Sequence, residues 1–187
     1  MLTEEERRIL WSTASEAIED SLTGRELRMV ENAPPALLIP CGAFVTLHHQ
    51  GKLRGCIGYI EPVKPLIQTV QEVAIKAAFE DPRFPPLTEN EHVQIEISVL
   101  SPPKRVLDIS SIEVGKDGLI IELGPRRGVL LPQVAAEYSW DRETFLENTA
   151  MKAGLPPDAW RHPAVKIYRF SAEIFGYTLR PHEEETR

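Results

Sequence analysis

A cysteine held between two glycines constrains this chain more than any other feature. Residues 53–58 read Leu-Arg-Gly-Cys-Ile-Gly, with one thiol, Cys56, and an arginine, Arg54, two residues before it. Glycine permits positive φ and close backbone approach at a cost in local stability, so Gly55 and Gly58 beside one cysteine indicate a specified geometry. In an extended segment Arg54 and Cys56 would share one face, because side chains alternate along a strand.

Two interpretations of Cys56 follow from this segment. A guanidinium close to a thiol favours the thiolate, which is the reactive form, so Arg54 would activate Cys56. Alternatively, the segment belongs to a buried hairpin in which the cysteine is a small apolar residue and the glycines serve bulges. The sequence leaves both interpretations open.

The segment forms the second half of a predicted β-hairpin. Residues 44–49 are β-branched and apolar, and Gln50-Gly51-Lys52 supplies the turn. His48 and His49 are adjacent, so a strand points them to opposite faces and they cannot share a metal. One of them could approach Cys56 across the hairpin; the alternative is a pair of strand-end histidines with no special role.

The rest of the pattern predicts an α+β fold of antiparallel strands with helices between them. Thr3 and Glu6 form a predicted capping box for a helix that ends before Gly24. Two more helices are expected at residues 65–78 and 141–153, the second with Gly154 at C′. Alternation and apolar runs predict strands at residues 93–99, 119–123, 129–131 and 165–170. Residues 182–187 read as a polar tail.

Composition excludes several classes of protein. The 187 residues suit one domain, possible as two sub-lobes, and 21 basic against 28 acidic residues give a net charge of −7. That charge disfavours nucleic-acid binding through the phosphate backbone. The amino terminus lacks an apolar signal region and no window approaches the ~20 apolar residues of a membrane span, so we expect a cytoplasmic protein. Cys41 and Cys56 are too few for a disulfide scaffold.

Motifs that carry known chemistry are missing. The chain has no CxxC pair, HExxH, EF-hand, P-loop, Rossmann glycine pattern or GxSxG elbow, so no metal or cofactor is predicted. What remains is Cys56 and its candidate helpers. A nucleophilic cysteine needs a base or an electropositive setting, and Arg54, one of the two histidines, Glu61 or Asp81 could supply part of it.

The ordered motifs resemble the AMMECR-one domain family. The hallmark is residues 53–58 preceded by Gly-Ala-Phe-Val-Thr-Leu at 42–47. The family's other motifs follow in order at residues 81–84 (Asp-Pro-Arg-Phe), 95–100 (Ile-Glu-Ile-Ser-Val-Leu), 130–134 (Leu-Leu-Pro-Gln-Val) and 152–155 (Lys-Ala-Gly-Leu). The resemblance covers nearly the whole chain, with a core of about residues 3–180.

Two positions depart from the family pattern. Tyr59 stands where the family usually has threonine or a similar small residue, and Ala150 stands where many members carry a cysteine. A mechanism that needs two family cysteines is therefore in doubt here.

The resemblance implies a fold of two unequal lobes with a cleft near the motif. It also implies a prokaryotic setting beside a Memo-like metalloprotein and a radical S-adenosylmethionine protein, but no reaction, because the family's activity is not established. One hypothesis is a cysteine-dependent enzyme with Cys56 and Arg54 as catalytic residues. The other, which we favour slightly because no complete catalytic set is present, is an adaptor or substrate-binding module for a small molecule or peptide. Its expected binding residues are Arg54, Gly55, Gly58, Asp81, Arg83, Phe84 and Gln133.

Overall fold

The computed structural model describes residues 1–28 and 32–177. The predicted polar tail at 182–187 lies outside the described residues. The chain divides into two compact units, one of Met1–Val99 with Glu173–Arg187 and the other of Leu100–Ala172. Both combine antiparallel strands with helices, so the predicted α+β class is confirmed. A cleft between lobes stays a prediction.

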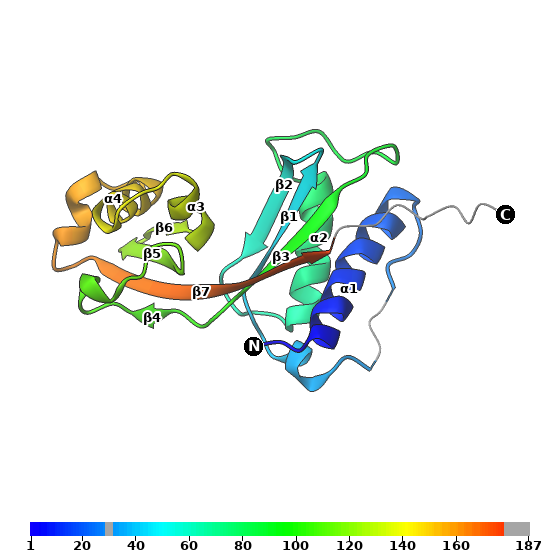
Figure 1. The fold of residues 1–187 in the computed structure, drawn as a ribbon, viewed down its shortest axis with the longest axis horizontal. Coiled ribbons are helices and arrows are strands. Elements are labelled where there is room, and N and C mark those ends of the chain that lie inside the picture. Colours follow the sequence, from blue (N-terminus) through cyan, green and yellow to red (C-terminus); the bar gives the residue numbers. More distant parts are fainter. Residues whose placement is uncertain (29–31, 178–187) are drawn as a thin grey trace. The chain divides into compact units, whose positions relative to one another are not determined.

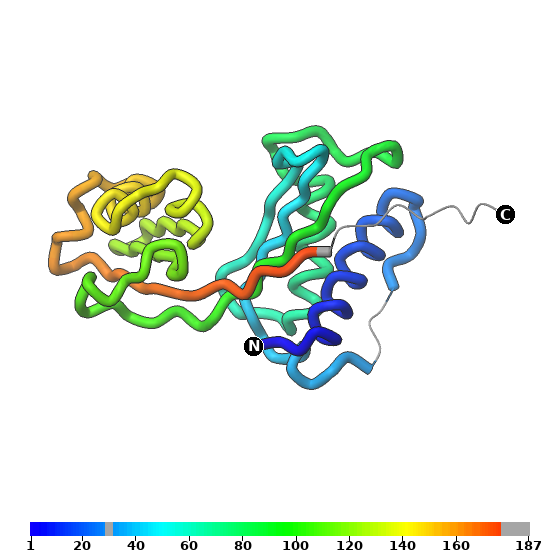
Figure 2. The backbone as a smooth tube through the Cα atoms, viewed as in Figure 1, coloured from blue at the N-terminus to red at the C-terminus, as the bar shows by residue number. Residues whose placement is uncertain are grey.

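The first unit is built on an antiparallel sheet in the order β2-β1-β3 (Figure 1). The strands are β1 (Ala43–His49), β2 (Lys52–Tyr59) and β3 (Gln94–Leu100). The last part of β7 (Lys166–Tyr177) runs beside β3 and completes the sheet on that side (Figure 2). Strand β2, which carries Cys56, is therefore an edge strand.

The predicted hairpin is present, with a bulge that the sequence did not indicate. Gln50 and Gly51 have φ values of 51° and 75°, as a two-residue turn between twisted strands requires. Along the ladder, Leu47 faces Gly55 but His48 faces Leu53. Arg54 is thus the extra residue of a β-bulge, which interrupts the alternation of side chains along β2.

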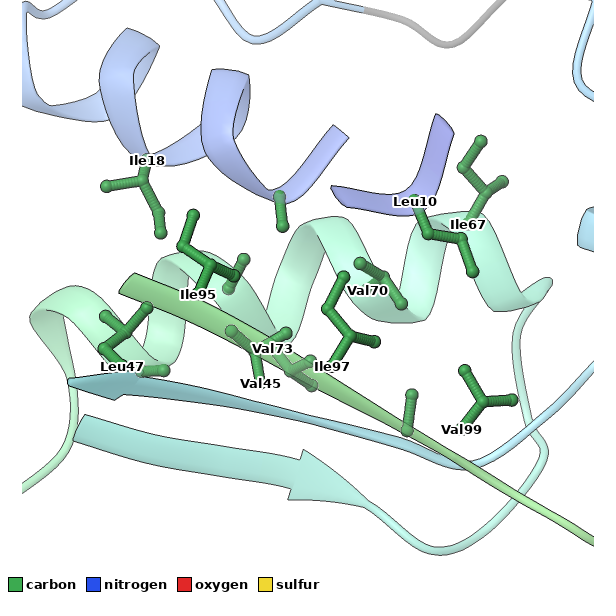
Figure 3. Close-up of a cluster of buried hydrophobic side chains, with 14 of the residues drawn as sticks. Leu10, Ile18, Val45, Leu47, Ile67, Val70, Val73, Ile95, Ile97 and Val99 are labelled. Atoms are coloured by element: carbon green, nitrogen blue, oxygen red, sulfur yellow. The ribbon is translucent and has the colours of Figure 1, made fainter. Parts of the chain in front are cut away.

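Helices α1 (Glu4–Leu22) and α2 (Leu66–Phe79) lie over one face of this sheet (Figure 1). The predicted capping box starts α1: the Glu6 N–H donates to Thr3 Oγ1 at 3.2 Å and the Thr3 N–H donates to Glu6 Oε2 at 2.7 Å. Apolar side chains from the two helices and the three strands form one core. Figure 3 shows Leu10, Ile18, Val45, Leu47, Ile67, Val70, Val73, Ile95, Ile97 and Val99 within it.

The second unit has its own sheet and core. Strand β5 (Asp117–Leu123) pairs with β6 (Arg126–Leu130) and with the first part of β7, which also pairs with the short β4 (Lys104–Arg105). Helices α3 (Pro132–Glu137) and α4 (Arg142–Lys152) contribute to a core centred on the buried Phe145 and Leu146. Gly154, with φ of 71°, follows the end of α4 as predicted.

Two elements differ from the sequence prediction. Helix α3 is too short to show a helical period and was not predicted. Strand β7 continues to Tyr177 instead of ending at residue 170, because its second part pairs in the first unit's sheet. Within the described ranges, no helix combines the length and apolar character that crossing a bilayer requires.

Candidate functional site

Cys56 lies half-buried on β2, directly opposite Thr46 of β1. The Cys56 Sγ and Thr46 Oγ1 atoms are 3.2 Å apart and hydrogen bonded. Thr46 is in turn opposite Glu96 of β3. The three side chains therefore form a row of thiol, hydroxyl and carboxylate across the sheet, since residues opposite each other on paired strands project from the same face.

The loop after α2 (residues 80–93) satisfies the outer edge of β2 at this cysteine. The Cys56 N–H donates to Asp81 Oδ2 at 2.9 Å, and the Arg83 guanidinium donates to the Cys56 carbonyl at 3.2 Å. Both main-chain groups of Cys56 are thus taken as a neighbouring strand would take them. Two side chains stand in for one residue of an additional strand.

Asp81 and Arg83 also bind each other. Arg83 donates to the Asp81 carboxylate from its backbone N–H, Nε and Nη2, at 3.1, 3.0 and 2.7 Å. Asp81 is only 4% exposed. The Arg83 hydrogen bonds, followed by the one from the Cys56 N–H, hold the pKa of Asp81 well below its ordinary value despite burial. Asp81 is therefore a fixed anion and not a proton carrier near neutral pH.

Arg54 binds the same loop farther along. Its Nε and Nη2 donate to the two carboxylate oxygens of Glu91 at 2.6 and 3.0 Å, and Nη2 also donates to the Pro86 carbonyl at 3.3 Å. Arg54 is 9% exposed. This pairing lowers the pKa of Glu91 to about 2. Arg54, the extra residue of the bulge, thus binds the 80–93 loop to β2.

Arg54 does not act on the Cys56 thiol in the way that the first interpretation expects. The cation whose charge favours the Cys56 thiolate is Arg83, while Arg54 pairs with Glu91. Burial raises the pKa of the Cys56 thiol above its ordinary value, and this outweighs the opposing effects of the Thr46 hydroxyl and Arg83. The charges of Asp81 and Glu96 raise the pKa further. Near neutral pH the group is a thiol.

Of the two properties of glycine considered, positive φ and close backbone approach, the structure uses close approach at both positions. Neither Gly55 nor Gly58 has a positive φ. A Cβ on Gly55 would lie 2.1 Å from the carbonyl oxygen of Ala77 in α2, so only glycine lets β2 approach this helix so closely. A Cβ on Gly58 would lie 2.2 Å from the ring of Phe44 on the neighbouring strand.

The other predicted site residues occupy different places. Phe84 is half-buried beneath the guanidinium of Arg83, whose Cζ lies 5.5 Å from the ring centroid. Gln133 belongs to α3 of the second unit. Across the hairpin His48 faces Leu53 and not Cys56, and the ring of His49 is hydrogen bonded to the His92 carbonyl at 2.9 Å. Cys41 and Cys56 are both free thiols.

Three residues of the site escaped the sequence analysis. Thr46 and Glu96 become neighbours of Cys56 only through strand register, and Glu91 only through the course of the loop. The sequence gives one indication of Thr46 and Glu96, because each is a polar residue between two apolar ones on an alternating strand. Both side chains are therefore expected on the face of the sheet that points away from the core. In the part of the chain that the structure describes, no three His, Cys, Asp or Glu side chains gather as metal ligands would.

Comparison with known proteins identifies the family of this chain. The AMMECR1 family model matches residues 11–175. A protein of Methanothermobacter thermautotrophicus is 50% identical over 184 residues, covering 93% of this chain and 95% of its own. Protein MJ0810 of Methanocaldococcus jannaschii is 45% identical, covering 94% and 92%. The crystal structure of the uncharacterised protein PH0010 from Pyrococcus horikoshii superposes with a TM-score of 0.87 at 42% identity, over 94% of this chain and 93% of that one. This chain therefore belongs to the AMMECR1 family.

Proposed function

We propose that this protein is a substrate-binding or adaptor component that works through the surface around β2. The observation that carries the proposal is the state of Cys56, whose half-buried thiol has a raised pKa and whose peptide groups are both bound by the 80–93 loop. These features suit a structural residue that keeps the backbone of β2 in one conformation. Nucleophilic catalysis instead needs a thiolate that forms near neutral pH.

The partners in this proposal are a Memo-like metalloprotein and a radical S-adenosylmethionine protein. They would supply the metal and radical chemistry, and this chain would present a small molecule or peptide to them. Arg83 and Phe84 border the surface, since the Arg83 side chain is 53% exposed and lies over the Phe84 ring. The proposed location is the cytoplasm.

A cysteine-dependent enzyme is the second candidate. One observation favours it: the Thr46 hydroxyl and the charge of Arg83 both act to lower the pKa of the Cys56 thiol. Arg54 has no role in this version, because Glu91 occupies its guanidinium. The candidate requires a bound ligand or partner to remove the effect of burial.

Alkylation of the two cysteines as a function of pH separates these candidates. Intact protein is treated with iodoacetamide, and the modified peptides containing Cys56 and Cys41 are quantified by mass spectrometry. The adaptor proposal expects an apparent Cys56 pKa above the free value of about 8.5. Cys41 is the internal control, because burial raises the pKa of that half-buried thiol as well. A Cys56 pKa below the free value would favour the enzyme.

The adaptor proposal also requires association with the partners. Purified Memo-like and radical S-adenosylmethionine proteins, tested separately and together by isothermal titration calorimetry, should bind the full chain. Cys56→Ala should leave that binding intact, because the thiol serves packing. Absence of binding to either protein, alone or together, would overturn the adaptor role.

A further inference from the structure

Past Cys56, no strand among residues 1–28 and 32–177 pairs with the outer edge of β2 at Gly58. Cys56 sends its N–H and carbonyl outward to the loop, so the Cys56–Thr46 pair is one of the pairs that exchange no ladder hydrogen bonds. Because such pairs alternate along an antiparallel ladder, the Gly58–Phe44 pair is of the same kind. The N–H and carbonyl of Gly58 therefore also point away from β1.

No group within residues 1–28 and 32–177 occupies these two main-chain positions at Gly58. The contrast with Cys56 is direct, since the same two groups there are taken by Asp81 and Arg83. Exposed main-chain donors and acceptors on an edge strand are a template for another extended chain.

A hollow lies next to this open edge. It has a volume of ≈ 500 Å³ and is lined by Gly58, Tyr59, Ile60, Glu61, Val63, Lys64 and Glu72. Its charged groups are largely committed to one another: Glu72 accepts from the Tyr59 hydroxyl at 2.7 Å and from the Lys64 ammonium. The Val63 side chain, by contrast, is 74% exposed. The hollow thus offers apolar surface to one incoming side chain.

We infer that the Gly58 edge binds an extended segment of a partner protein by β-strand addition. The segment's main chain pairs with the N–H and carbonyl of Gly58, and one apolar side chain enters the hollow beside Val63. This inference rests on the proposed function, since it names what the adaptor surface recognises.

A second copy of this chain fits the edge less well than a free peptide. Two β2 edges pairing around a two-fold axis at Gly58 would run the second strand through the space that Asp81 and Arg83 occupy beside Cys56. A flexible segment avoids this loop by ending or turning away before it. The accessible edge is therefore short, and a peptide suits it.

The test uses a phage-displayed library of random heptapeptides selected on the intact protein. The expected peptides alternate β-branched and apolar residues, and a selected peptide should slow amide hydrogen exchange at Gly58, as followed by NMR. Methylating the peptide nitrogen that faces Gly58 removes one hydrogen bond and should weaken binding about fivefold. Val63→Arg, which fills the hollow with charge at an exposed position, should weaken it at least about tenfold.

Leu107→Arg is the matched control, because Leu107 is 93% exposed and lies in the second unit. It should bind the peptide as the wild-type protein does. The inference is overturned by a selection without enrichment, by peptides that bind Val63→Arg equally well, or by unchanged exchange at Gly58. Concentration-dependent dimerisation that protects Gly58 would assign the edge to a second copy instead.

These outcomes are separable from those of the proposed function. Partners that bind the full chain while no peptide protects Gly58 would remove the strand-addition mode and leave the adaptor role. A peptide that protects Gly58 in a protein whose Cys56 has a low pKa would keep the peptide site and favour the enzyme.

Discussion

Asp81 Oδ2 accepts the peptide N–H of Cys56 at 2.9 Å, across 25 positions of the chain. With Arg83 on the carbonyl of the same residue, the loop binds the β2 edge at the thiol, whereas no group in the described part of the chain binds this edge at Gly58. The motif therefore works together with the Asp-Pro-Arg-Phe run at residues 81–84, which holds its central residue in place. The two family motifs, residues 53–58 and 81–84, are therefore linked to each other by hydrogen bonds.

Replacing Asp81 tests how much the link between the two motifs stabilises the protein. Asp81→Ala removes the acceptor for both the Cys56 N–H and the Arg83 guanidinium, and it leaves the N–H of the half-buried Cys56 without a partner. The free energy of unfolding, measured by urea denaturation, should fall by about 3 kcal/mol. Glu80→Ala is the control, because the Glu80 carboxylate is 60% exposed and makes a longer contact of 3.6 Å with Lys76. The free energy of unfolding of this variant should change by no more than about 0.5 kcal/mol. An equal loss of unfolding free energy in the two variants would contradict a stabilising link between the two motifs.

The Arg54–Glu91 pair should show strong coupling in a double-mutant cycle. Arg54→Met leaves the Glu91 carboxylate without its bidentate partner and should cost about 2 to 3 kcal/mol, whereas adding Glu91→Gln should recover part of that loss. We expect a coupling energy of about 1 to 3 kcal/mol from urea denaturation.

The comparison pair for this cycle is Arg161–Glu143. It has a similar separation of 3.0 Å, but its side chains are 58% and 61% exposed. Its coupling should be about 0.5 kcal/mol or less. If the two cycles gave the same coupling energy, Arg54 would not be fastening the loop.

Acid should release the loop in a defined pH range. Arg54 lowers the pKa of Glu91 to about 2, and Arg83 lowers that of Asp81. A carboxyl group with a depressed folded-state pKa adds stability above its unfolded pKa of about 4, and that stability is lost as the pH falls through the folded value. Urea midpoints should therefore drop between about pH 4.5 and pH 2.

Glu91→Gln isolates this effect, because the variant lacks one of the two carboxylates. Its stability should be lower at pH 7 and should change less than that of the wild type as the solution is acidified. Glu89→Gln alters an exposed carboxylate of the same loop and should keep the wild-type response. An identical acid response in Glu91→Gln and the wild type would refute the assignment to Glu91.

Features set by neighbouring residues could be predicted from the sequence. The Thr3–Glu6 capping box, the turn at Gln50 and Gly51, and Gly154 after α4 depend on contacts a few positions apart. Each has a residue preference with a direct physical cause. The helices and strands they bound were consequently placed within a few residues.

The site depended on contacts that the sequence does not encode locally. A two-residue turn alone would set Cys56 opposite Val45, but the bulge at Arg54 shifts the register so that Cys56 faces Thr46. Nothing in residues 53–58 distinguishes a bulged arginine from one that faces the thiol. Its partner, Glu91, lies 37 positions away. The pairing of Arg54 with Glu91 therefore becomes visible only in the folded structure, where the 80–93 loop lies beside β2.

Gly55 should tolerate no side chain, because of close packing. A Cβ there would meet the Ala77 carbonyl oxygen, which is main chain and can move only with α2. Gly55→Ala should therefore cost about 3 kcal/mol in urea denaturation. Gly55→Asn should be no milder, although asparagine tolerates positive φ better than other residues. Gly124→Asn is the control, since Gly124 has φ of 58° and no atom within 4 Å of its Cβ position.

The same substitution should change the chemistry of Cys56. Asp81 follows the end of α2 by two residues, so a displaced helix draws its carboxylate away from the Cys56 N–H. Gly55→Ala should then speed alkylation of Cys56 under native conditions while leaving Cys41 unchanged. Gly124→Asn should alter neither rate, because it lies in the second unit. A Gly55→Ala protein with wild-type stability and a wild-type Cys56 rate would mean that β2 and α2 have room to adjust.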